Sequence, residues 1–173
     1  MRGTARRRVS AYLVRTAPGY TSCSSWENAV TDGGWSASYW GGEAQAEAAT
    51  ISQGAVESNH AGFTGTGFVN YDNLAGSYVQ WNVSAAAAGP ATPAFRYANG
   101  TTANRPMDIT VNGTLARDEL AFPGTGAWTG WQTVTASVPL AAGVNTIRAT
   151  ATTANGGPNV DHLEVELAPP PKR

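Results

Sequence analysis

The sequence AFRYANGTTANRPMDITVNG, residues 94–113, decides the fold of this chain. Two short runs, 94–97 and 107–111, predict β-strands. The polar connection between them, 99–106, ends at a proline, which disfavours helical backbone at the residue before it. Asn112-Gly113 then predicts a tight hairpin turn, because both residues tolerate positive φ. A long loop of amides, hydroxyls and one guanidinium is a place where such a fold can hold a ligand.

The same alternation of short strands and turns continues over residues 44–168. Within 77–83 the polar Tyr78, Gln80 and Asn82 alternate with apolar neighbours, which is the period of a half-buried strand. The stretch 85–93 is predicted as a loop because glycine and prolines interrupt it. We predict strands at 46–51, 63–71, 77–83, 94–97, 107–111, 115–122, 131–140, 144–152 and 160–167. About eight to nine antiparallel strands without a helical period predict an all-β fold, a β-sandwich of the jelly-roll type.

Composition and charge exclude several classes of function. The chain has 173 residues, enough for one domain with a core, and only 13% of them are charged. Residues 44–168 carry four arginines against nine acids, a net charge of −5, which argues against nucleic acid as a partner. The single cysteine, Cys23, excludes an intramolecular disulfide framework. No run of 18 apolar residues occurs, so no membrane-spanning segment is predicted.

The two ends of the chain are predicted to lie outside the sandwich. Residues 1–43 lack a steady period, and two interpretations stay open for them: a partly disordered extension, or an extra strand or lid whose tryptophans pack on the body. Their basic start is not followed by an apolar segment, so it does not form an intact signal peptide. Residues 44–168 are the predicted domain, and residues 169–173 are a proline-rich tail or linker.

Chain direction predicts which end of the sandwich recognises a ligand. Antiparallel strands reverse at every connection, so successive loops alternate between the two ends. One end receives the loops at 71–76, 99–106, 122–130 and 153–159. The loops at the other end are small or apolar. The sequence therefore predicts a single recognition end, whose prominent side chains are Tyr71, Asn99, Arg105, Trp128 and Asn159.

Trp128 lies in a glycine-flanked loop shortly before Trp131. Trp131 opens an alternating run and is expected in the core. Trp128 has two interpretations, either a further core residue or a ring offered to a sugar. The C–H-rich face of a pyranose stacks on an aromatic plane, while amide and guanidinium groups bond to its hydroxyls.

Eight segments, in order along the chain, resemble carbohydrate-binding module family 35, with family 6 as a near cousin. They are QAEAAT (45–50), GFTGTGFVNYDN (62–73), GSYVQW (76–81), FRYANG (95–100), VNG (111–113), GAWTGWQT (126–133), LAAGVNTIR (140–148) and NVDHLEV (159–165). The resemblance implies a non-catalytic β-sandwich of jelly-roll type. Such modules are usually appended to a secreted polysaccharide-active enzyme.

The resemblance also implies a structural calcium ion held by Gln45, Glu47 and Asp161. The family commonly has glutamate at the first of these positions, but an amide oxygen still ligates calcium with less charge. Without the resemblance, each carboxylate is better explained as a solvated group. A second calcium ion at the sugar site is a further expectation, and Asn59 is a candidate to contribute to it.

The family's glycan site lies in loops at one end of the sandwich. The positions that match an aromatic and an amide of its relatives, together with further candidates from the same loops, are Trp128, Asn159, Asn99, Arg105 and Tyr71. Arg96 lies within a predicted strand and is expected to be a structural residue rather than a ligand contact.

Three classes of function follow from these observations. The first is a calcium-dependent module that binds a terminal uronic acid, either glucuronic acid or unsaturated galacturonic acid, and targets a linked enzyme. A variant of it binds neutral galactan, mannan or xylan. The second is a polysaccharide lyase or hydrolase, but the recognition loops offer only Asp72 as an acid, and neither HExxH nor GxSxG occurs. The third is a structural or adhesive β-domain. Secretion is expected from the family and the ligand class.

Overall fold

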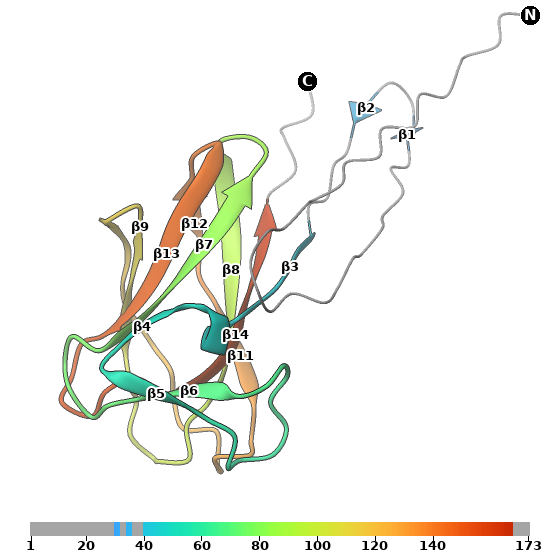
Figure 1. The fold of residues 1–173 in the computed structure, drawn as a ribbon. Coiled ribbons are helices and arrows are strands. Elements are labelled where there is room, and N and C mark those ends of the chain that lie inside the picture. The colour runs from blue at the N-terminus through green and yellow to red at the C-terminus, as the bar shows by residue number, and fades with distance from the viewer. Residues whose placement is uncertain (1–29, 32–33, 36–39, 168–173) are drawn as a thin grey trace, which may run out of the picture.

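The computed structural model describes residues 30–31, 34–35 and 40–167, which form β-strands and one short 3₁₀ helix. β1 (Val30–Thr31) and β2 (Gly34–Trp35) pair with each other. The remaining strands form two antiparallel sheets that share one core (Figure 1), which confirms the predicted all-β sandwich. In the part of the chain described, no helix is long and apolar enough to cross a bilayer.

One sheet has five strands. In spatial order they are β10 (Thr114–Leu120), β9 (Met107–Val111), β13 (Gly143–Ala151), β7 (Tyr78–Ala85) and β4 (Thr50–Ser52). Its longest pairing joins β13 to β7, where Gly143 lies opposite Ala85 and Thr150 opposite Tyr78. β9 and β10 are joined through Asn112 and Gly113, with φ of 50° and 80°, so the predicted hairpin turn is confirmed.

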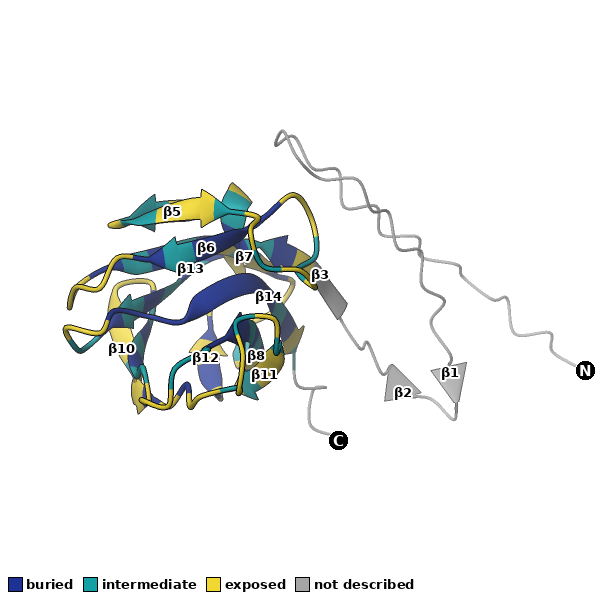
Figure 2. Ribbon diagram, turned by 90° about the horizontal axis from the view of Figure 1, so that it is seen from below, coloured by how far each residue is buried: buried dark blue, intermediate teal, exposed yellow. Residues whose placement is uncertain are grey.

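The other sheet has seven strands. Its main path runs through β11 (Gln132–Thr135), β8 (Gly89–Ala98), β14 (Asn159–Leu167), β6 (Phe68–Tyr71) and β5 (Gly54–Glu57). β12 (Val138–Leu140) also pairs with β8, and β3 (Trp40–Gln45) also pairs with β14; the 3₁₀ helix η1 (Ala46–Ala48) follows β3. Figure 2 shows β14 buried along most of its length, whereas β5 and β10 carry exposed residues.

The core between the sheets follows the alternation that the sequence predicts for 77–83. Val79 and Trp81 are 0% and 2% exposed, whereas their polar neighbours on β7 face outward. The Trp81 ring lies 5.9 Å from the Phe95 ring on the opposite sheet, and Phe122 contacts both Phe95 and Tyr97. Because burial of one such side chain contributes roughly 1.5–3 kcal/mol, this aromatic cluster is a major attachment between the two layers.

The segment 63–67, predicted as the start of a strand, is a loop. Gly62 and Gly65 adopt positive φ of 100° and 68°, which ends any extended run. The backbone N–H groups of Thr64 and Thr66 donate to side chains instead of to a neighbouring strand. β6 therefore begins only after this loop.

Other boundaries also differ from the prediction. Residues 46–48 form η1 rather than a strand, and β5 was not predicted. β8 begins at Gly89, within the predicted loop, because proline weakens a strand without excluding it where no donor is needed. The longest predicted strand breaks near Ala136, whose N–H donates to Pro93 O at 3.0 Å. Of the segment 1–43, the structure describes only β1, β2 and residues 40–43 of β3, so both interpretations of that segment stay open. The proline-rich tail lies outside the described residues.

Candidate functional site

Four loops meet at one end of the sandwich, as the alternation of strand direction predicts, and they lie at the lower end of the molecule in Figure 1. They are residues 72–77, 99–106, 121–131 and 152–158. Asn99 O accepts the N–H of Thr125 at 2.8 Å, which joins the second loop to the third. Arg105 donates to Gly157 O at 3.0 Å and to Asn73 Oδ1 at 3.3 Å, which joins the second loop to the fourth and the first. We refer to these four segments as the loop cluster.

Trp128 lies half-buried in the loop cluster and is not part of the inter-sheet core. Its indole packs against Gly100, where a Cβ atom would come within 2.6 Å of the ring. The His60 ring is nearly parallel to the indole, with 6.0 Å between centroids and 21° between planes. Arg105 Cζ lies 5.6 Å from the indole centroid. An aromatic plane beside a fixed cation suits a ligand that combines an apolar ring face with a negative charge.

Arg105 is half-buried and is held by three protein acceptors through one of its nitrogens. Its Nη1 donates to Asn155 O at 2.6 Å as well as to Gly157 O and Asn73 Oδ1. Nε is buried without a partner among the described residues. Nη2 makes no hydrogen bond with these residues. Partial burial lowers the pKa of the guanidinium from its usual value, yet arginine stays cationic at neutral pH.

Asn159 opens β14 at the same end of the sandwich, and its backbone pairs with Ala98 of β8. The residue is only 3% exposed, but its side-chain amide makes no hydrogen bond within the described chain. This leaves an unpaired amide at the base of the loop cluster. Asn59 is exposed in the loop 58–67, next to the His60 that stacks on Trp128.

Asn99, predicted as a ligand contact, is a structural residue. It is 0% exposed, and its Nδ2 donates to Ala103 O at 2.8 Å and to Phe122 O at 3.0 Å. Its Oδ1 accepts the N–H and the hydroxyl of Thr101 at 3.1 and 2.7 Å. Because all of these groups are occupied by the protein, Asn99 shapes the loop cluster and has no group left for a sugar.

Tyr71 and Trp131 also differ from their predicted roles. Tyr71 is 3% exposed in the core, where burial raises the pKa of its phenol and the hydroxyl donates to Ala149 O at 3.0 Å. Its hydroxyl is therefore bonded inside the core rather than offered to a ligand. Trp131, expected in the core, is half-buried outside it, and its Nε1 donates to Ala61 O at 2.9 Å.

The residues that the family resemblance assigns to calcium converge on the loop 58–67. Asp161 Oδ1 accepts the N–H of Thr64 at 2.9 Å, and Glu47 Oε1 accepts the N–H of Thr66 at 2.8 Å. Gln45 Nε2 lies 3.1 Å from Thr64 Oγ1. Three oxygen-bearing side chains from β3, η1 and β14 thus surround one short segment of backbone.

The chemistry of this oxygen cage fits a hard cation. Glu47 Oε2 is buried and has no partner among the described residues. The cage also closes tightly over Gly65, where a Cβ atom would overlap Glu47 Oε1 and lie 2.8 Å from Gln45 Oε1. Carboxylate, amide and backbone oxygens are the ligands that calcium prefers, so the residues present suit this ion.

Asp161 and His162 shift each other's pKa in opposite directions. Burial raises the pKa of the Asp161 carboxyl, but hydrogen bonds from His162, Thr64 and Arg96 outweigh it and hold the pKa below its usual 3.8. Burial lowers the pKa of His162, but the Asp161 carboxylate, 3.3 Å from Nδ1, and nearby glutamates outweigh it and hold the pKa above its usual 6.5. Asp161 is therefore an anion with protein donors on several sides.

Several contributors to this region were not predicted. The stacking of His60 on Trp128 depends on the loop 58–67, part of which was predicted as a strand. The ion pair of Arg96 with Asp161 joins β8 to β14. Glu43, His162 and Glu164 also bring their ligand atoms within 4.8 Å of one another. The alternate spacing of His162 and Glu164 on one strand was the available signal for that group.

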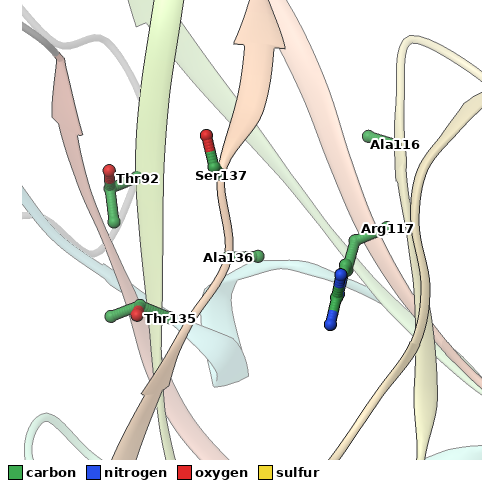
Figure 3. Close-up of a pocket in the computed structure, with 6 residues that line it drawn as sticks. All are labelled: Thr92, Ala116, Arg117, Thr135, Ala136 and Ser137. Carbon is green, nitrogen blue, oxygen red and sulfur yellow. The ribbon is translucent and has the colours of Figure 1, made fainter.

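A hollow of about 340 Å³ lies on another part of the surface, between the edge strands of the two sheets. It is lined by Thr92, Ala116, Arg117, Thr135, Ala136 and Ser137 (Figure 3). None of these residues belongs to the loop cluster. Arg117 lies on β10, and its guanidinium makes no hydrogen bond or ion pair within the described chain.

Comparison with known proteins finds a matching family model and enzymes that contain a similar segment. The model of the family "Carbohydrate binding module (family 6)" matches residues 45–166. An exo-β-D-glucosaminidase of Amycolatopsis orientalis is 63% identical over 119 residues, which is 69% of this chain and 12% of the relative. An endo-1,4-β-xylanase B of Cellvibrio japonicus is 45% identical over 124 residues, 71% of this chain and 20% of the relative. The chain thus spans a fifth or less of the length of these two enzymes.

Two solved family 35 modules resemble this chain over more than nine tenths of their own length. A family 35 module from Clostridium thermocellum is 50% identical, with a TM-score of 0.70 and coverage of 71% of this chain and 95% of that one. A family 35 module solved with a disaccharide that contains glucuronic acid is 41% identical, with a TM-score of 0.65 and coverage of 74% and 91%. The chain therefore belongs to the carbohydrate-binding modules of family 35 and the related family 6.

Proposed function

We propose that this module binds a terminal uronic acid in a calcium-dependent way and targets a linked carbohydrate-active enzyme to its substrate. One observation carries the proposal: Arg105, whose Nη2 makes no hydrogen bond with the described residues, has its Cζ 5.6 Å from the ring centroid of Trp128 and lies at the same end as the unpaired amide of Asn159. The family 35 relative solved with a glucuronic-acid disaccharide supports the same ligand class.

Each group would have a distinct task. The indole of Trp128 stacks on the C–H face of the sugar, the charge of Arg105 meets the carboxylate, and the amide of Asn159 bonds to hydroxyls. A module with these groups binds and does not hydrolyse, because a glycosidase needs two carboxylates across the scissile bond and the loop cluster contains only Asp72.

Calcium has a structural part in this proposal. Gln45, Glu47 and Asp161 would hold the ion, which supplies positive charge to the cage and fixes the loop 58–67. Because that loop carries His60 onto Trp128, removal of the ion is expected to loosen one wall of the sugar site. A second ion bridging the sugar carboxylate, with Asn59 among its ligands, belongs to the same proposal.

Isothermal titration calorimetry with glucuronate, glucose and xylose tests the ligand class. We expect binding of glucuronate in calcium and a loss of at least about tenfold in affinity with EGTA, which corresponds to about 1.4 kcal/mol. Trp128→Ala should abolish binding. Arg105→Lys should weaken glucuronate binding selectively, whereas Arg117→Lys, in the edge hollow, should leave it unchanged. Equal heats for glucuronate and neutral sugars would contradict the uronate proposal and favour a neutral polysaccharide.

The targeting role and secretion rest on the relatives, which are named as polysaccharide-active enzymes much longer than this chain. A pull-down of the module with insoluble polysaccharides, with and without uronic-acid side groups, measures targeting directly. We expect retention only on the uronate-bearing material, and equal retention on both would contradict the proposal.

A further inference from the structure

The loop 58–67 is attached to the protein at two separate places. At its base, Thr64 and Thr66 donate their N–H groups to Asp161 and Glu47, at 2.9 and 2.8 Å. At its tip, Ala61 O accepts the indole N–H of Trp131 at 2.9 Å. The base belongs to the oxygen cage, and the tip belongs to the sugar site.

Arg96 joins these two attachments. Its Nη1 forms an ion pair with Asp161, and its Nη2 donates to Gly62 O at 2.9 Å. Its Cζ lies 5.3 Å from the centroid of the Trp131 ring. The residue is on β8, where the backbone pairs with β11 on one side and β14 on the other, so its own position is fixed. One guanidinium therefore contacts the cage, the tip of the loop and the tryptophan that holds the tip.

The tip of the loop has little freedom to move independently. Gly62 has a φ of 100°, and a Cβ atom there would come within 2.8 Å of the Trp131 ring, so backbone and indole are in direct contact. Two residues earlier, the His60 ring lies parallel to Trp128. A shift of Gly62 away from Arg96 would consequently carry His60 away from Trp128.

We propose that Arg96 is a positioning residue of the glycan site: it holds the tip of the loop 58–67 against Trp131, and through the loop it places His60 beside Trp128. Arg96 itself does not touch the sugar. Charge-assisted hydrogen bonds to a carboxylate and a carbonyl are strong enough to fix a loop. When the loop is ordered before binding, the entropic cost of ordering it does not reduce the free energy of sugar binding. The effect on affinity rests on the proposed function, whereas the placement of the loop does not.

Proton NMR of the imidazole groups tests the placement directly, because the chain contains only two histidines. Arg96→Met removes both the ion pair and the bond to Gly62 O, and we expect the His60 signals to shift out of the ring-current field of Trp128. Arg96→Lys keeps the charge beside Asp161 and should restore most of the wild-type shift. Arg148→Met is the matched control, since Arg148 lies on the other sheet, bonded to Gln80 at 2.9 Å.

Calorimetry with glucuronate then measures the consequence. Arg96→Met should weaken binding by about tenfold, the change that corresponds to about 1.4 kcal/mol. Should that variant fail to fold, Trp131→Phe removes the bond to Ala61 O from the other side and should shift the same His60 signals. Unchanged His60 signals in folded Arg96→Met or Trp131→Phe would overturn the placement. Wild-type protein that binds no uronate would refute the proposed function, while the NMR comparison would still decide the role of Arg96.

Discussion

Replacing Asn99 by aspartate tests whether this residue shapes the loop cluster or contacts the ligand. The change keeps the size of the side chain and the oxygen that accepts from Thr101. It replaces the Nδ2 donor with an acceptor that lies 2.8 Å from Ala103 O and 3.0 Å from Phe122 O. Two attractive contacts therefore become oxygen–oxygen repulsions in a side chain that is 0% exposed.

The expected cost follows from these contacts. A buried polar group left without its partner costs about 1–3 kcal/mol, and Phe122 O retains a second donor, the N–H of Arg105 at 3.2 Å. We therefore expect Asn99→Asp to lower the free energy of unfolding by about 2–4 kcal/mol. For a domain of this size the melting temperature should fall by about 5–15 °C. Because the loops at 99–106 and 121–131 both depend on Asn99, glucuronate affinity should fall as well.

Urea and thermal denaturation, followed by circular dichroism, measure this change. Asn82→Asp is the matched control, because Asn82 is exposed on β7 and its side chain makes no hydrogen bond among the described residues. The control should stay within about 0.5 kcal/mol of the wild type. If Asn99→Asp melts with the control but loses sugar binding, then Asn99 is a ligand contact, and its assignment as a structural residue is wrong.

Three further predictions follow from the same contacts. Tyr71→Phe should lower the free energy of unfolding by about 1–2 kcal/mol and leave glucuronate affinity unchanged, as measured by denaturation and calorimetry. Gly100→Ala places a Cβ atom within 2.6 Å of the Trp128 ring, so it should displace the indole, change its fluorescence and weaken sugar binding with little loss of stability. The third prediction concerns pH in the presence of EGTA. The lowered pKa of Asp161 contributes stability above pH 3.8, and this contribution is lost as the pH falls through the folded pKa. The raised pKa of His162 contributes stability below pH 6.5, and this contribution is lost as the pH rises through the folded pKa. The melting temperature should therefore decline at acid pH and at alkaline pH, and His162→Gln should remove the decline at alkaline pH.

The features that the sequence predicted correctly are those set by local rules. The alternation around Val79 and Trp81 follows from the two-residue period of a strand, and the Asn112-Gly113 turn follows from tolerance of positive φ. The gathering of loops at one end follows from antiparallel chain direction alone. This prediction stayed correct although some strand boundaries were wrong. The presence of β3 and β5 and the split between β11 and β12 did not change the end at which the later loops lie.

The roles of single residues were less predictable, because they depend on partners distant in the sequence. Asn99 and Asn159 are the same residue type in the same group of loops. The amide of Asn99 donates to Phe122 O, 23 residues away, whereas the amide of Asn159 makes no hydrogen bond within the described chain. Tyr71 looked like a loop residue but ends a strand whose inner face is buried. No property of the single residue separates these cases.

A recognition surface made of polar loops has to satisfy its own hydrogen bonds before it can satisfy those of a ligand. In this protein Asn99 is used entirely for that purpose, and one nitrogen of Arg105 donates to three protein acceptors. In the loop cluster, the groups left over include Nε and Nη2 of Arg105, the amide of Asn159 and the ring of Trp128. It follows that sites of this kind are identified by what remains unpaired after folding, and that polarity in a loop is by itself a poor guide to which residues bind.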